Sequence, residues 1–320
     1  MDYVTLGNSD LSVSRICVGG MSFGRPSADF HEWTLEPEET EQMVVRALGL
    51  GINFFDTANV YSHGTSEEYL GAALKKHAKR EDVAIATKVY FNEGHLSREA
   101  IAREAEQSLR RLGTDYIDLY IIHRFDSTTP IEETMEALDS LVKSGKVRAL
   151  GASAMYGYQF HNMQMCAEQN GFTQFVSMQN HYNLLYREDE RELIPVCRQY
   201  NVSLTPYSPL AAGRLSRMEW TAGTKRSRTD RTARSKYDGT EAQDSEIVRS
   251  VHEVAERHGA TMSQVAIAWQ YAKGVASPII GATKPEYLDD AAKASGITLT
   301  EADIAALEQH YLPHKVVGAL

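Results

Sequence analysis

Four side chains that can move or stabilise a proton follow three predicted buried strands. Asp56 ends the apolar run 52–55 and precedes Tyr61, Lys88 follows the run 83–87, and His123 follows the run 117–122. Tyrosine, with an ordinary pKa of about 10, is a weak acid at neutral pH. A lysine ammonium and a polarising histidine would stabilise its phenolate and ease proton transfer, with Asp56 keeping Lys88 charged and in place. Such a tyrosine could protonate an alkoxide that forms when hydride reaches a carbonyl carbon.

Taken singly, each of these residues has a plainer structural explanation. An aspartate at a strand end commonly caps a helix or forms an ion pair, and a lone histidine is more often a satisfied polar residue than a catalyst. Ionisable side chains tolerate the buried end of a strand only when they are paired. Because they follow successive strands whose ends could meet at one mouth, we interpret them as one shared site.

The rest of the chain alternates apolar runs with amphipathic segments. Runs predicted as strands cover 15–20, 52–55, 83–87, 117–122, 147–151, 175–178, 202–206 and 277–280. Predicted helices cover 38–50, 66–77, 97–112, 131–144, 157–170, 189–200, 244–258 and 263–273. Eight strand–helix units without a Pro/Ser-rich linker predict a single α/β domain over 1–320 with the (β/α)8 TIM-barrel fold.

Three segments lie outside this alternation. Residues 3–13 are predicted as a β-hairpin that closes the N-terminal end of the barrel, 210–243 as a polar insertion, and 298–320 as a C-terminal helix and tail. A doubly wound dinucleotide fold would need G-x-G-x-x-G between a strand and a helix. The corresponding turn, Gly19-Gly20-Met21-Ser22-Phe23-Gly24, leads into a loop, which argues against that fold.

Composition narrows the classes of function. Apolar residues make up 42% and charged residues 24% of the 320, enough for a large core in a globular protein. A net charge of −10 disfavours nucleic acid and anionic membranes as partners. We expect no membrane span, no signal peptide and no metal site, because no long apolar run, no basic–apolar leader and no metal-ligand cysteine spacing occurs. The widely spaced cysteines fit the reducing cytoplasm.

The chain resembles the aldo-keto reductases, NADPH-dependent carbonyl reductases built on the (β/α)8 barrel. The segments that carry the resemblance are 56–61 (Asp-Thr-Ala-Asn-Val-Tyr), 86–88 (Ala-Thr-Lys), 119–123 (Leu-Tyr-Ile-Ile-His), 207–210 (Tyr-Ser-Pro-Leu) and 278–283 (Pro-Ile-Ile-Gly-Ala-Thr). Segments 123–126 and 312–318 resemble a bacterial-type branch often described as aryl-alcohol dehydrogenases or sugar-related reductases. The resemblance implies that Tyr61 is the general acid and base, Lys88 lowers its pKa, Asp56 anchors the lysine and His123 orients the carbonyl.

The resemblance also implies NADPH/NADP+ as cofactor. Around the nicotinamide and its ribose the matching residues are Gly20, Met21, Asp56, Ser153, Gln179 and Tyr207, of which Tyr207 would stack on the ring. The matching pyrophosphate loop comprises Ser208, Pro209, Leu210, Gly213 and Arg214. At the adenosine end the positions are Gly281, Thr283, Tyr287 and Asp290. There Thr283 could bind the 2′-phosphate, Tyr287 could pack on adenine, and Asp290 could face its amino group.

The insertion carries six cations, between Lys225 and Lys236, with only Asp230 among them acidic. It is either a solvated loop or a mobile flap over the cofactor phosphates, hinged at Gly223 and Gly239. Arg226 is the strongest candidate for the 2′-phosphate.

Two further classes of function stay open at this stage. One is a Schiff-base lyase in which Lys88 is the nucleophile, and the other is a non-catalytic NADPH-sensing partner protein. For the substrate, an aromatic pocket is predicted from Met21, Phe23, Trp33, Tyr61, Tyr90, Phe91 and Phe125. Arg124 could attract a carboxylate or phosphate on a small-molecule carbonyl substrate, or form a salt bridge with Asp126.

Overall fold

Eight parallel strands form the centre of the molecule. The computed structural model describes residues 1–220, 223 and 225–317. The strands follow one another in the order β10-β3-β4-β5-β6-β7-β8-β9. Their bounds are β3 (Cys17–Gly19), β4 (Phe54–Asp56), β5 (Ala84–Val89), β6 (Ile117–Ile122), β7 (Val147–Ser153), β8 (Phe175–Gln179), β9 (Ser203–Leu204) and β10 (Ile279–Ile280).

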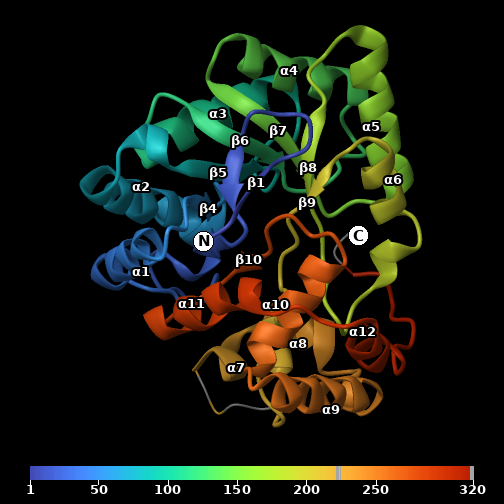
Figure 1. Cartoon of the computed structure of the whole chain (residues 1–320). Coiled ribbons are helices and arrows are strands. Elements are labelled where there is room, and N and C mark those ends of the chain that lie inside the picture. Colours follow the sequence, from blue (N-terminus) through green and yellow to red (C-terminus); the bar gives the residue numbers. More distant parts are fainter. Residues whose placement is uncertain (221–222, 224, 318–320) are drawn as a thin grey trace.

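Backbone hydrogen bonds join the two ends of this sheet. The amide of Ala276 donates to the carbonyl of Leu204 at 3.0 Å, and that of Ile279 donates to the carbonyl of Pro206 at 2.9 Å. The sheet is thereby closed, and the predicted (β/α)8 barrel is confirmed. Helices surround it on the outside (Figure 1).

The helices between the strands are amphipathic, and most of them begin within one residue of the predicted start. They are α1 (Pro37–Gly49), α2 (Thr65–His77), α3 (Arg98–Leu112), α4 (Ile131–Lys143), α5 (Gly157–Asn170), α6 (Leu193–Gln199), α9 (Glu241–His258) and α10 (Met262–Ala272). In α3 the Ser97 hydroxyl accepts a hydrogen bond from the Ala100 amide, and Gly113, at φ 65°, ends the helix. The expected apolar face of α3 is buried: Ile101, Ala105, Leu109 and Leu112.

The predicted hairpin is formed by β1 (Tyr3–Thr5) and β2 (Ser12–Ser14). Leu6 and Val13 are fully buried and share a core cluster with inward-facing strand residues such as Phe54 and Leu119. The hairpin therefore closes one end of the barrel, in front of the strands in Figure 1. The opposite end, where the parallel strands have their carboxyl termini, is left for chemistry.

The insertion is helical rather than an extended loop. It contains a 3-10 segment η5 (Ala211–Ser216) and two short helices, α7 (Lys225–Thr229) and α8 (Arg231–Tyr237). The Asp230 carboxylate caps α8 by accepting a hydrogen bond from the Ala233 amide at 2.9 Å. We did not predict this helix, although an aspartate just before it was a helix-start signal in the sequence. The following helix, α9, also begins earlier than predicted, at Glu241 rather than 244.

After the last strand come α11 (Pro285–Ala292) and the predicted C-terminal helix, α12 (Glu301–Glu308). None of the helices in the described part of the chain is long and apolar enough to cross a membrane. Residues 318–320, including Gly318 of the segment that suggested a bacterial-type branch, lie outside the described residues, as does the side chain of Lys225.

Candidate active site

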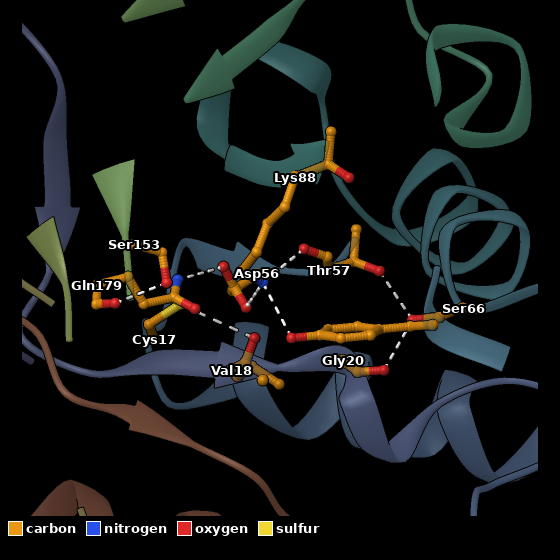
Figure 2. Close-up of polar contacts among 12 residues, drawn as sticks. Cys17, Val18, Gly20, Asp56, Thr57, Ser66, Lys88, Ser153 and Gln179 are labelled. Atoms are coloured by element: carbon orange, nitrogen blue, oxygen red, sulfur yellow. Dashed lines mark hydrogen bonds and ion pairs between the residues drawn. The ribbon is translucent and has the colours of Figure 1, made fainter. Parts of the chain in front are cut away.

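Asp56 and Lys88 meet inside the barrel because of strand alternation. Side chains two residues apart on a strand share a face, so Asp56 points inward with Phe54, and Lys88 with Ala86. The Lys88 side chain is completely buried, and Asp56 is 3% exposed. The ammonium donates to the Asp56 carboxylate at 2.5 Å and to the Thr57 carbonyl at 2.7 Å (Figure 2).

Tyr61 is brought to this pair by a kinked turn. The segment η2 (Tyr61–Gly64) contains Ser62 and His63 in the left-handed region, at φ 46° and 57°. Such backbone costs free energy and concentrates at functional sites. The turn places the Tyr61 hydroxyl 3.2 Å from the Lys88 ammonium, whose nitrogen also lies 4.7 Å from the centre of the phenol ring.

The protonation states favour proton donation by Tyr61. Burial raises the pKa of Tyr61, and the charge of Lys88 offsets this only in part. The resemblance implied that Lys88 lowers that pKa, but desolvation outweighs the lysine because the site is dry. The pKa of Lys88 is raised, since Asp56 and Tyr61 together outweigh burial, so Lys88 stays an ammonium and is a poor nucleophile.

His123 lies against the tyrosine as a neutral ring. Its centroid is 5.8 Å from that of Tyr61, and Phe91 packs on it at 5.0 Å. Burial lowers the pKa of His123 well below its usual range, and the charges of Lys88 and Arg124 add to the effect. The buried Nδ1 atom has no hydrogen-bond partner among the described residues. A neutral imidazole beside a protonated phenol can donate a hydrogen bond to a carbonyl oxygen.

A second layer of hydrogen bonds holds the catalytic candidates. The Gln179 amide donates to the other oxygen of Asp56 at 2.9 Å, and the Ser153 hydroxyl donates to the Gln179 carbonyl at 2.7 Å (Figure 2). Both residues were predicted only as ligands of the cofactor around its nicotinamide. The structure gives them the additional task of fixing the carboxylate that holds Lys88.

Ser66 was predicted only as the start of a helix. Its hydroxyl lies 2.8 Å from that of Thr57 and donates to the Gly20 carbonyl at 2.7 Å (Figure 2). It therefore joins the end of β4 to the turn after β3. The available signal in the sequence was that Ser66 lies in the segment between Asp56 and Glu67, which carries the candidate site.

One cavity of about 1770 Å³ collects most of the predicted site. Its lining includes Met21, Asp56, Tyr61, His123, Ser153, Gln179, Tyr207, Ser208, Pro209, Leu210, Gly213, Arg214, Arg226, Gly281, Thr283, Tyr287 and Asp290. Two predicted residues are not in the lining. Lys88 is buried beneath Tyr61, and Gly20 lies against the Asp56 carbonyl, which an added Cβ would approach to 2.9 Å.

The wall after β9 suits a flat ring and a phosphate chain. Tyr186, His181 and Tyr207 stack in sequence, with centroids 4.2 Å and 5.2 Å apart, and Tyr207 presents itself to the cavity. The following loop turns with φ 56° at Ser208 and φ 93° at Gly213. Left-handed backbone of this kind can direct amide groups toward an anion.

The far end of the cavity is covered by the insertion. The Arg226 guanidinium lies 4.3 Å from the Trp33 ring centre, and one of its nitrogens lies 4.0 Å from where a Cβ on Gly281 would be. Arg226 thus spans the cavity between the loop before α1 and the loop after β10. With a stacking tyrosine and a cation in its lining, the cavity can hold a phosphorylated dinucleotide.

Two candidates at this end already have protein partners. Arg214 forms an ion pair with Asp238 at 2.5 Å and is 8% exposed, so it ties η5 to the end of α8. Asp290 accepts hydrogen bonds from Thr261 at 2.9 Å and Gln264 at 2.7 Å, which fix the start of α10. Part of each side chain's bonding capacity is therefore structural.

The predicted aromatic pocket is partly wrong. Phe23 is fully buried in the core, and Tyr90 and Phe125 pack against that core instead of lining the cavity. Met21, Trp33, Tyr61 and Phe91 do line it. Phe30 was missed, although it lines the cavity with its ring 6.2 Å from that of Tyr61. Aromatic residues in the segment before α1 were the signal, but nothing in a loop sequence says which of them faces inward.

Among the described residues there is no cluster of histidine, cysteine or carboxylate side chains that could hold a metal ion.

Comparison with known proteins gives a consistent result. The model of the aldo/keto reductase family matches residues 15–312. An aldo-keto reductase of Fusarium vanettenii is 40% identical over 99% of this chain and 93% of its own. The versiconal hemiacetal acetate reductase of Aspergillus parasiticus is 40% identical over 99% and 98%. A Schizosaccharomyces pombe protein provisionally named an aryl-alcohol dehydrogenase is likewise 40% identical over 99% and 98%.

A solved structure is similar as well. The crystal structure of a thermostable aldo-keto reductase, in complex with the inhibitor epalrestat, superposes with a TM-score of 0.78. The two chains are 29% identical, over 97% of this chain and 100% of the other.

Proposed function

This chain belongs to the aldo/keto reductase family, and we propose that it is an NADPH-dependent reductase of aldehydes and ketones in which Tyr61 is the proton donor. Membership makes it a carbonyl-reducing oxidoreductase. One observation supports the finer assignment above others. A protonated tyrosine contacts the ammonium of a buried ion pair, beside a neutral histidine and within a cavity of dinucleotide size.

The residues divide the proton chemistry among them. The nicotinamide, when bound, supplies the hydride. The carbonyl oxygen accepts hydrogen bonds from the Tyr61 hydroxyl and the His123 imidazole, which stabilise the negative charge that develops there. Tyr61 then transfers its proton to that oxygen, and Lys88 stabilises the phenolate left behind. Asp56 keeps Lys88 charged and, with Gln179, keeps it in position.

We propose that the cofactor lies along the cavity with its nicotinamide on Tyr207. Ser153 and Gln179 would bind the carboxamide, and the segment 208–214 would surround the pyrophosphate. Preference for NADPH over NADH would come from Arg226, helped by Thr283, because a guanidinium pairs well with a phosphate dianion. Arg226 supports this assignment because it already bridges the cavity to Trp33.

The two competing classes of function are less well supported. A Schiff-base lyase needs a neutral amine that a carbonyl carbon can reach, whereas Lys88 is fully buried and held as an ammonium. A purely sensing protein would not need the proton-donating arrangement of Tyr61, Lys88 and His123.

Aromatic carbonyl compounds are the proposed substrate class. The Phe30 ring centre lies 6.2 Å from that of Tyr61, and the Phe91 ring centre lies 5.0 Å from that of His123. Rings at these distances can stack on or contact an aromatic substrate edge to face. The name of the related aryl-alcohol dehydrogenase points to the same class.

The deciding experiment compares wild type with Tyr61→Phe by following NADPH absorbance with aromatic aldehydes, dicarbonyls and sugar aldehydes. Removing the general acid should lower kcat by about 10²–10⁴-fold and leave NADPH binding intact. Tyr158→Phe, which changes a tyrosine that is 59% exposed, is the matched control and should behave as wild type. Full activity in Tyr61→Phe, or NADPH binding without any reduction by wild type, would refute the proposal.

A further inference from the structure

Two cations that line the cavity lie near residues of the proposed reaction site, Arg124 beside Phe91 and Lys236 beside Tyr207. Arg124 directly follows His123, and its guanidinium carbon lies 5.8 Å from the Phe91 ring centre. Lys236, on α8, places its ammonium 4.5 Å from the Tyr207 ring centre and 3.4 Å from the Tyr207 hydroxyl. Arg124 belongs to the loop after β6 of the barrel, and Lys236 belongs to the insertion.

Lys236 shows how the two cations influence each other. Burial lowers the pKa of Lys236 to about 8, with the positive charge of Arg124 adding to the effect and Asp230 opposing it. The Asp230 carboxylate is itself engaged by Arg226 at 3.2 Å and by the Ala233 amide at 2.9 Å. Within the described part of the chain no carboxylate forms an ion pair with Lys236, and its hydrogen-bond partner there is the Tyr207 hydroxyl.

Lys236 carries its charge in a partly desolvated cavity near Arg124, and a bound anion would favour the charged form of Lys236. An arginine fork and a lysine ammonium both recognise carboxylate and phosphate groups. Because Lys236 is carried by the insertion, an anion held between the two residues would also draw α8 toward the barrel.

The position of these cations relative to the proton donor indicates which molecule carries the anion. The Phe91 ring centre lies 5.0 Å from that of His123 and 5.8 Å from the Arg124 guanidinium carbon. A ring lying along Phe91 with its carbonyl at His123 and Tyr61 would direct its opposite edge toward Arg124. The cations assigned to the cofactor are Arg214, which pairs with Asp238, and Arg226, which pairs with Asp230 and lies beside Trp33.

We propose that Arg124 and Lys236 form an anion subsite, which selects aromatic aldehydes bearing a carboxylate or phosphate on the ring edge away from the carbonyl. This inference rests on the proposed reductase function and adds the substrate class to it.

The test uses aldehydes of matched shape and different charge. Para-formylbenzoate is anionic, and para-nitrobenzaldehyde has a neutral group of the same outline; para-formylphenyl phosphate is measured beside them. The quantity of interest is the ratio of kcat/KM for each anionic aldehyde to that for the neutral one, in the full-length protein with NADPH. Lys236→Met and Arg124→Met should each lower this ratio about 10-fold, as expected for the loss of one charge-assisted hydrogen bond.

Three controls distinguish the loss of an anion subsite from a general loss of folding or of cofactor binding. Lys236→Arg keeps the charge and should restore the ratio, and Arg231→Met removes a charge from the exposed face of the same helix and should leave the ratio at the wild-type value. The NADPH affinity should fall much less in Lys236→Met than the ratio does, although Lys236 contacts Tyr207. The larger fall in ratio, for carboxylate or for phosphate, identifies the natural anion.

Two results would overturn the subsite. One is an unchanged ratio in both methionine variants, and the other is a loss of NADPH affinity equal to the loss in ratio, which would assign the cations to the cofactor. If wild type reduced the neutral aldehyde well and the ratio did not respond, the reductase function would stand without the subsite. If wild type reduced none of the aldehydes, the proposed function itself would fail.

Discussion

The buried pair of Asp56 and Lys88 makes a quantitative prediction for Asp56→Asn. The variant keeps the shape of the side chain but leaves an ammonium with no exposed surface and no counter-charge. Removing one partner of a buried ion pair costs about 3–5 kcal/mol. Because an asparagine oxygen and the Thr57 carbonyl can still accept from Lys88, we expect the lower end, about 3 kcal/mol. At about 2 °C per kcal/mol, the melting temperature should fall by about 6 °C.

The same change should alter the dependence of kcat on pH. Burial pushes the pKa of Lys88 down, and in the wild type Asp56 and Tyr61 push it above its ordinary value. Without the Asp56 charge the pKa of Lys88 must fall, so the ammonium is lost as the pH rises through that lower value. The kcat of Asp56→Asn should therefore decline toward alkaline pH in a range where the wild-type kcat is constant.

Stability and activity should separate in the double variant Asp56→Asn/Lys88→Met. Replacing a whole buried ion pair by apolar groups is often neutral or stabilising, so the melting temperature should recover most of the loss. Activity should not recover, since Tyr61 then lacks its cation. Glu136→Gln, which breaks an ion pair with Arg98 at the exposed surface, is the control and should cost less than about 1 kcal/mol. The single variant Lys88→Met completes the comparison. If the loss of stability in the double variant equalled the sum of the losses in Asp56→Asn and Lys88→Met, the coupling inferred from the 2.5 Å contact would be refuted.

Contacts elsewhere in the molecule make three more predictions. Arg226→Ala should weaken NADPH binding about 10-fold and NADH binding little, because only NADPH carries the 2′-phosphate that we assign to Arg226; fluorescence titration measures both, and an equal loss would place Arg226 at the pyrophosphate or at neither. Gly20→Ala would bring a Cβ to 2.9 Å from the Asp56 carbonyl and 3.2 Å from the Ser66 hydroxyl, so we expect a loss of about 1–3 kcal/mol in thermal unfolding, against Gly49→Ala as a control with no atom within 4 Å. His314→Gln removes a ring that is hydrogen-bonded to buried Asp244 at 3.0 Å. Burial lowers the pKa of His314, but the hydrogen bond and charge of Asp244 outweigh burial, so the pKa is raised. A pKa that is higher in the folded than in the unfolded state stabilises the folded protein below the unfolded pKa of about 6.5. The wild type should therefore be more stable than His314→Gln by about 1–3 kcal/mol at acidic pH, and this difference should shrink as the pH rises through the folded-state pKa. Urea unfolding across that pH range measures the difference, and a difference that grew with pH would contradict us.

The fold was predictable because its signals are local and repeated. The apolar runs that became β5 and β6 are buried along their whole length, and they are flanked by helices with clear starts, such as Ser97 before α3. The insertion was harder to predict. Its short helices α7 and α8 depend on Asp230 as a cap and on the pair of Arg214 with Asp238, contacts that a polar stretch of sequence does not reveal.

The sequence predicted which residues form the candidate site better than it predicted the hydrogen bonds among them. Asp56, Tyr61, Lys88 and His123 could be named because each stands at or just after the end of a predicted strand. The sequence could not predict the hydrogen bond from Gln179 to Asp56, or those by which Ser66 joins Thr57 to Gly20. These contacts join residues that are far apart in sequence or that come together only when the barrel closes. The same reason explains why Phe23 and Phe125 were placed in the pocket and Phe30 was not.

The sequence by itself determined which residue types stand at the strand ends, since the period of two in strands and the alternation of strand and helix are written into the chain. The tertiary structure alone decided how dry the site is. Desolvation comes from packing by segments remote in sequence, and it sets the protonation of Tyr61 and His123 in the directions that proton donation requires. It also decided that Lys236, on a helix unrecognised in the sequence, would face the same cavity as Arg124.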